Sequence, residues 1–197
     1  MPATQPPRRL GRPPKQAATD GPDTATALLQ AAVAEFVERG YGDTDTNRIA
    51  RRAGFAPQTF YRWYSDKLDI FIKVYQAWEE AEHSMLDSLL TERASPAQIA
   101  QRCVQGHQSF LQFRRSLREL CLLEPRVRAA RTTTRHQQIQ HIRGSNPHAP
   151  DEAMLAALLI QIERLSEALA EGEIDDLKLD TAPAYAALAS LIAQLRP

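Results

Sequence analysis

The sequence predicts an all-α protein, and three observations point to this fold class. Alanine and leucine dominate the apolar residues, whereas alternating runs of β-branched residues are missing. Apolar residues recur at spacings of three and four along most of the chain, as they do on one face of a helix. Capping residues and prolines stand where these periodic segments begin. At 197 residues, the chain is long enough for a small module and a larger domain.

The first helices are expected within a small domain over residues 22–67. One apolar stripe predicts a helix over about 23–39, and Gly40 follows in the position that glycine favours after a helix end. Asp45 is well placed as the N-cap of a second helix, which covers about 46–53.

A third, short helix is expected to begin at Pro57, because proline lacks only an N–H group that the first turn does not need. It should end near Tyr64, since the Ser65-Asp66 pair opens a new cap. This helix is rich in hydrogen-bond donors and large polar aromatics: Gln58, Thr59, Tyr61, Arg62 and Trp63. A DNA major groove requires donors and flat side chains on a rigid element, so the segment predicts DNA binding.

Longer helices are expected in a second domain over residues 68–197. Their approximate ranges are 67–93, 96–113, 114–124, 126–143, 152–171 and 182–195. Asp151 is the expected cap of the helix over 152–171, and the composition of residues 144–150 indicates a loop before it.

Residues 1–21 are rich in Pro, Arg, Thr and Ala and are expected to form a flexible basic arm. Four positive charges lie close together in it: Arg8, Arg9, Arg12 and Lys15. Its Gly-Arg-Pro core resembles the AT-hook, a short segment that places arginine in the DNA minor groove. The alternative is a tail whose charge is incidental.

The formal net charge is zero, but the charge is divided along the chain. Residues 1–67 carry ten Lys and Arg against seven Asp and Glu, and residues 114–150 carry eight Arg against two Glu. Residues 151–197 hold nine acids against three basic residues. The last two segments could be solvated faces, could pair within the fold or across a dimer, or could place arginines beside an anionic ligand.

Several classes of protein are not expected. No stretch approaches ~18 uninterrupted apolar residues and the N-terminus has no apolar signal core, so we expect a cytoplasmic protein without a membrane span. Cys103 and Cys121 suit a reducing compartment as buried thiols, with a thiol sensor as the alternative. His136 and His141 lack the spacing and the acidic partner of a metal site. No Ser/His/Asp arrangement stands out, so we predict neither an enzyme nor a cofactor.

The stretch from Leu28 to Leu68 resembles the TetR/AcrR family, named after the tetracycline repressor, of bacterial one-component regulators. The resemblance rests on the following positions in order: Leu28, Leu29, Ala31, Ala32, Phe36, Gly40, Tyr41, Thr44, Ile49, Ala50, Ala53, Gly54, Thr59, Phe60, Tyr61, Tyr64 and Lys67. Tyr64 stands where most members have Phe, and Pro57-Gln58 stands where many have Gly or Ala. The preferred DNA sequence should therefore differ from that of glycine-bearing relatives.

The resemblance implies that the helix from Pro57 is a recognition helix in the major groove. Gln58 and Arg62 are then expected to read adenine and guanine, and Thr59 to contact a phosphate or a thymine methyl group. Tyr61 and Trp63 would hold the flanking DNA backbone. Thr46 and Lys67, at the starts of two helices, would bind phosphate.

The resemblance also implies that residues 68–197 form an effector-binding and dimerisation domain. Its pocket would be lined by large side chains of partial polarity, although each could be plain core: Tyr75, Trp78, His107, Phe110 and Phe113. Residues 151–171 and 181–195 would form a homodimer interface. The implied function is a repressor that a small molecule releases from a pseudo-palindromic double-stranded DNA operator. The alternative is an architectural or adaptor DNA-binding protein without an effector.

Overall fold

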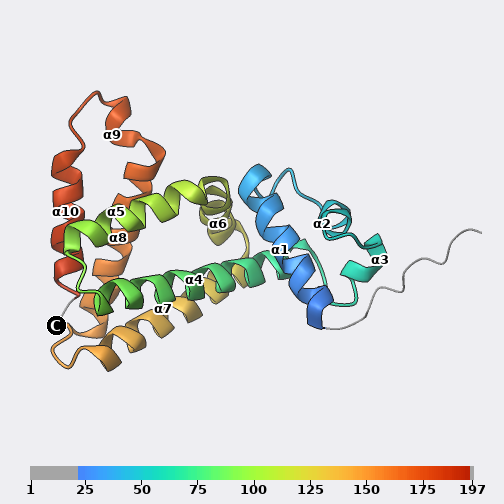
Figure 1. Ribbon diagram of the computed structural model, residues 1–197, viewed down its shortest axis with the longest axis horizontal. Coiled ribbons are helices and arrows are strands. Elements are labelled where there is room, and N and C mark those ends of the chain that lie inside the picture. Colours follow the sequence, from blue (N-terminus) through green and yellow to red (C-terminus); the bar gives the residue numbers. More distant parts are fainter. Residues whose placement is uncertain (1–21, 196–197) are drawn as a thin grey trace, which may run out of the picture.

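A computed structural model describes residues 22–195, and every regular element in this range is a helix (Figure 1). A small head contains α1 (Pro22–Arg39), α2 (Thr46–Arg52) and α3 (Pro57–Phe60). The body contains α4 (Lys67–Thr91), α5 (Pro96–Ser109), α6 (Leu111–Leu123), α7 (Pro125–Ser145), α8 (Glu152–Glu171), α9 (Glu173–Asp176) and α10 (Ala182–Ala193). None of these helices is long and apolar enough to cross a membrane.

Side-chain caps lie at the starts of α2, α4, α5 and α8. The Asp45 carboxylate accepts a hydrogen bond from the Arg48 N–H at 2.8 Å, and the Asp151 carboxylate accepts one from the Met154 N–H at 2.8 Å. At the start of α5, Ser95 and Gln98 form a reciprocal capping box. These side chains satisfy N–H groups that a helix start leaves without intrahelical partners.

Some predicted boundaries are wrong by several residues. The helix expected to reach Tyr64 ends at Phe60, and residues 61–63 form a turn, in which the N–H groups of Trp63 and Tyr64 share the Phe60 carbonyl oxygen. The single helix expected over 96–113 is broken at Phe110, which leaves helical geometry (φ −120°, ψ 25°). Its ring packs against Trp78, with the centroids 6.2 Å apart, so a tertiary contact accompanies the break.

Two hydrophobic clusters form the core of the described chain. The first joins the head to α4, α6 and α7, and it includes Phe36, Phe60, Phe71 and Phe113, all fully buried. The second joins α5, α8 and α10, around Val104 and Leu188. As Figure 1 shows, α4 runs from the head along the length of the body with α7 beside it. α4 therefore connects the head to the body.

Candidate DNA-binding surface

The α2–turn–α3 unit presents one face of α3 outward. Gly54 makes the turn with φ of +81°, a conformation that favours glycine. Ile49 and Ala50 of α2 and Phe60 of α3 are fully buried, and they form the packing between the two helices. Because Phe60 fixes the inner face of α3, its neighbours in the sequence are directed away from the core.

The outer residues of this segment are exposed. Gln58 and Arg62 are exposed, Tyr61 is 58% exposed and Trp63 is 38% exposed. Pro57 and Thr59 are half-buried. α3 lies at the end of the molecule remote from α10 (Figure 1). The donors and aromatics predicted to contact DNA thus share one accessible, rigidly supported surface.

Thr46 and Tyr61 join the two helices at this surface. The Thr46 hydroxyl and the Tyr61 phenol oxygen are 2.9 Å apart and share a hydrogen bond. The bond holds the Tyr61 ring beside the start of α2. Both hydroxyls can therefore be presented to the same stretch of DNA backbone.

Lys67 has a different environment from the one expected of a phosphate ligand. Its ammonium donates to the carbonyl oxygens of Tyr41 at 2.7 Å and Thr44 at 2.8 Å, and it lies 3.9 Å from the centroid of the Tyr41 ring. Burial lowers the pKa of Lys67. Two of its three donors are engaged within the chain, so at most one remains for a phosphate.

Two of the three arginines of α2 lie beside acidic residues of α1. Arg52 pairs with Glu38 and with Glu35, whose side chain is only 6% exposed. Arg48 lies 3.8 Å from the same Glu35 carboxylate. Arg51 is exposed on α2. Sequence reasoning could not separate these three, because the separation depends on how α2 crosses α1.

The predicted minor-groove residues Arg8, Arg9, Arg12 and Lys15 lie outside the described residues. Their assignment therefore stays a prediction.

The residues predicted to line an effector pocket pack against one another. Trp78 contacts the rings of His107, Phe110 and Phe113, with centroids 6.5, 6.2 and 6.3 Å away. Tyr75 is 2% exposed and belongs to the same core as Trp78 and Phe113. Burial, with the charge of Arg114, lowers the pKa of His107 to about 3.

A cavity of about 160 Å³ lies elsewhere, between α4, α5, α7, α8 and α10, and none of those five residues lines it. We call it the distal cavity. Its apolar lining includes Leu86, Leu90, Ile99, Leu159, Ile162 and Ile192, and its polar lining includes His83, Asp87, Gln138 and His141. The sequence did not distinguish these apolar residues from ordinary core, because cavity linings and core share the same helical spacing.

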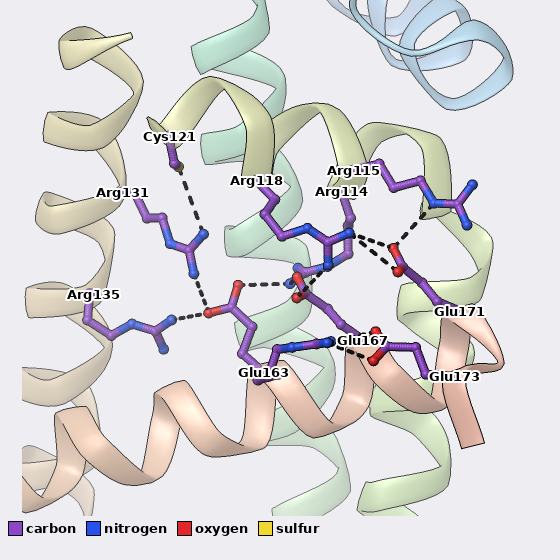
Figure 2. Close-up of polar contacts among 11 residues, drawn as sticks. Arg114, Arg115, Arg118, Cys121, Arg131, Arg135, Glu163, Glu167, Glu171 and Glu173 are labelled. Atoms are coloured by element: carbon purple, nitrogen blue, oxygen red, sulfur yellow. Dashed lines mark hydrogen bonds and ion pairs between the residues drawn. The ribbon is translucent and has the colours of Figure 1, made fainter. Parts of the chain in front are cut away.

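The arginine-rich and acid-rich segments pair with each other inside the body (Figure 2). Arg114, whose side chain is 4% exposed, lies 2.8 Å from the carboxylates of both Glu163 and Glu167. The second oxygen of Glu163 lies 2.5 Å from Arg131 and 2.6 Å from Arg135. Burial raises the pKa of Glu163, but these three arginines hold it below its usual value overall. Of the alternatives open from the sequence, pairing within the fold is the one that the structure contains.

Comparisons with known proteins match the head to bacterial transcriptional regulators. Residues 28–74 match the family described as "Bacterial regulatory proteins, tetR family". The chain is 28% identical over 94 residues to the uncharacterized HTH-type transcriptional regulator YdgC of Bacillus subtilis. That match covers 47% of this chain and 48% of YdgC, so the chain spans about half the length of this relative.

Solved structures share the helical arrangement over most of the chain. SCO7518 of Streptomyces coelicolor A3(2) superposes with a TM-score of 0.65 at 18% identity, over 88% of this chain and 98% of that one. The transcriptional regulator FadR of Bacillus subtilis, in complex with stearoyl-CoA, superposes with a TM-score of 0.55 at 19% identity, over 86% and 96%. These likenesses establish the fold of head and body together.

Proposed function

We propose that this chain, whose residues 28–74 match the tetR family of bacterial regulatory proteins, is a sequence-specific repressor that a small molecule releases from its DNA operator. The observation that carries the proposal is the exposed surface of Gln58, Tyr61, Arg62 and Trp63 at the outer end of the head. A side chain pair of this kind, amide and guanidinium, can bind base edges bidentately in the major groove.

The proposed roles of the individual side chains at the DNA follow from how exposed each side chain is. Gln58 and Arg62 would read adenine and guanine, whereas Tyr61, Trp63 and Thr59 would bind the sugar-phosphate backbone and fix the register. The Thr46–Tyr61 hydrogen bond would keep the phenol oriented before contact with DNA, which reduces the entropy lost on binding. Lys67 would contribute mainly by holding the head in shape.

A homodimer would supply the second reading head. α8 exposes Met154 (51%) and Ile160 (59%), and α10 exposes Ala186 and Ala187. Exposed apolar side chains on two adjacent long helices are typical of a surface that pairs with its symmetry mate. Two α3 helices could then enter successive major grooves, about 34–36 Å apart, on a pseudo-palindromic operator.

Release of the protein from its operator by an effector would depend on a movement of α4. Its first residue, Lys67, bonds the turn after α1, and His83, Leu86 and Leu90 near its other end line the distal cavity. A ligand that shifted the end of α4 would therefore tilt the head and move one α3 relative to the other. The stearoyl-CoA complex of FadR supports the idea that a body of this fold can hold a ligand.

Capture of genomic DNA fragments by the full chain tests the proposal. A repressor should enrich a few fragments that share two half-sites, and footprinting should show protection on one face of the duplex. Enrichment without a shared sequence, together with equal affinity for unrelated duplexes, would instead indicate an architectural protein. Gel filtration that yielded a monomer at working concentrations would contradict the two-headed geometry.

A further inference from the structure

The size of the distal cavity restricts what can occupy it. Its volume is about 160 Å³, and an apolar cavity of roughly 150 Å³ in a protein core is large enough for one benzene molecule. Pockets for drug-sized ligands are larger, about 300–1,000 Å³. A long acyl chain joined to coenzyme A therefore exceeds this space, whereas a single ring matches it.

The polar groups of the cavity come mainly from α4 and α7, and most are already paired. Gln138 donates to Glu79 at 2.8 Å and accepts from Arg135 at 2.9 Å. His141 bonds the Asp87 carboxylate at 3.0 Å. These groups consequently have little capacity left for a ligand.

His83 is the exception. Its ring stacks on His141 with centroids 6.2 Å apart. Its Nε2 atom is shielded from solvent and has no hydrogen-bond partner among the described residues, the nearest carboxylate oxygen being that of Glu79 at 4.0 Å. A buried nitrogen without a partner loses its hydration and gains nothing in return, so a rotation of the ring that brought this nitrogen to a ligand oxygen in the cavity would be favoured.

The charges around His83 disfavour an anionic ligand. Asp87 lines the cavity and Glu79 lies beside His83, while Arg135, whose positive charge acts on His83, is paired with Glu163 at 2.6 Å. Burial, with the influence of His141 and Arg135, lowers the pKa of His83, which favours the neutral ring. A carboxylate placed here would face two negative groups without a free cation.

We propose that the distal cavity binds a small neutral molecule, a single aromatic or alicyclic ring with one hydroxyl or carbonyl oxygen that hydrogen-bonds His83. The apolar lining would enclose the ring, and His83 would select the oxygen. The class of ligand is inferred from the cavity itself. Only the effect of that ligand on DNA binding rests on the proposed function.

Phenol, benzene and benzoate test the proposal, because they share one ring and differ only in the group that would meet His83. Isothermal titration of the full chain should give saturable binding of phenol, about tenfold tighter than benzene and at least tenfold tighter than benzoate. In His83→Leu, phenol and benzene should bind equally, while His83→Gln should restore part of the difference. His136→Leu, a change at an exposed histidine of α7, is the matched control and should leave all three affinities unchanged.

Leu86→Phe should fill the cavity and abolish binding of every ring, with the circular dichroism spectrum retained. Tighter binding of benzoate than of phenol, binding of no probe, or unchanged phenol binding in Leu86→Phe would each overturn the proposal. Operator affinity is measured separately with phenol present. Phenol binding that leaves operator affinity unaltered supports the ligand class and contradicts the proposed release mechanism, so the two failures are distinguishable.

Discussion

The ammonium of Lys67 donates a hydrogen bond to the Tyr41 carbonyl oxygen at 2.7 Å and lies over the Tyr41 ring, 3.9 Å from its centroid. The first residue of α4 is thereby attached to the turn that follows α1. Because α4 continues into the body, this contact joins the orientation of the head to the position of α4.

Lys67→Met should destabilise the chain by about 1–3 kcal/mol, because two carbonyl oxygens lose a charged donor. Urea unfolding measures the change. Lys73→Met is the control: Lys73 is an exposed lysine of the same helix, whose ammonium donates to Gln76 at 3.3 Å, and its loss should change the free energy of unfolding by under about 0.5 kcal/mol. Equal effects of the two substitutions would contradict the assigned contact.

Gly40→Ala should also destabilise the junction. Gly40 has φ of +73°, and a Cβ atom there would lie 3.0 Å from the hydroxyl oxygen of Ser116. That hydroxyl accepts a hydrogen bond from the Tyr41 N–H at 2.9 Å, so it is not free to move aside. We expect a loss of about 1–3 kcal/mol by thermal unfolding. Gly42→Ala, where an added Cβ meets nothing within 4 Å, should be nearly neutral.

Arg114 and Arg115 are neighbours with very different expected contributions. Arg114 is buried between Glu163 and Glu167, and its replacement by Ala leaves their charges partly uncompensated, at a cost of about 3–5 kcal/mol. The Arg115 side chain is 45% exposed and contacts Glu171 at 3.3 Å, so Arg115→Ala should cost less than about 1 kcal/mol. Similar free energies of unfolding for the two variants would disprove this ranking.

Glu82 should make stability depend on pH. Burial raises its pKa to about 7 from an ordinary value of 4.5, so the unfolded chain releases this proton at a lower pH than the folded chain. The stability that protonation of Glu82 gives to the folded chain is fully present below pH 4.5 and is lost as the pH rises through about 7. The loss is on the order of 1–3 kcal/mol.

Denaturant unfolding at pH 5 and pH 8 checks this dependence. Glu82→Gln should reduce the difference between the two pH values, since the amide does not titrate. Glu80→Gln, an exposed neighbour on α4, should retain the wild-type difference. A full pH dependence in Glu82→Gln would assign the effect to other groups.

Local signals in the sequence were sufficient for the helices but not for their interruptions. Asp45 and Asp151 were predicted as caps because capping depends on residues within one turn, and both accept the expected backbone hydrogen bond. The break at Phe110 has no such signal. It coincides with the packing of Phe110 against Trp78, a contact between α4 and the start of α6 that no local pattern encodes.

The candidate sites were predicted to different degrees for a related reason. The exposed surface of Gln58, Tyr61 and Arg62 lies on one short segment, so its motif was visible in the sequence. The distal cavity and the Glu163 network each combine residues from several helices. Their composition depends on how α4, α7 and α8 cross, and the sequence pattern does not give those crossings.

Operator binding by Arg62→Ala tests the central claim most directly. With the captured operator, fluorescence anisotropy should show a loss of about 1–3 kcal/mol, roughly 5- to 150-fold in Kd, and a relaxed preference at one base pair. Arg102→Ala, at an exposed arginine of α5 in the body, should bind as the wild type does. If Arg62→Ala and Arg102→Ala both retain wild-type affinity and sequence preference, the segment from Pro57 to Trp63 is not the DNA-reading surface.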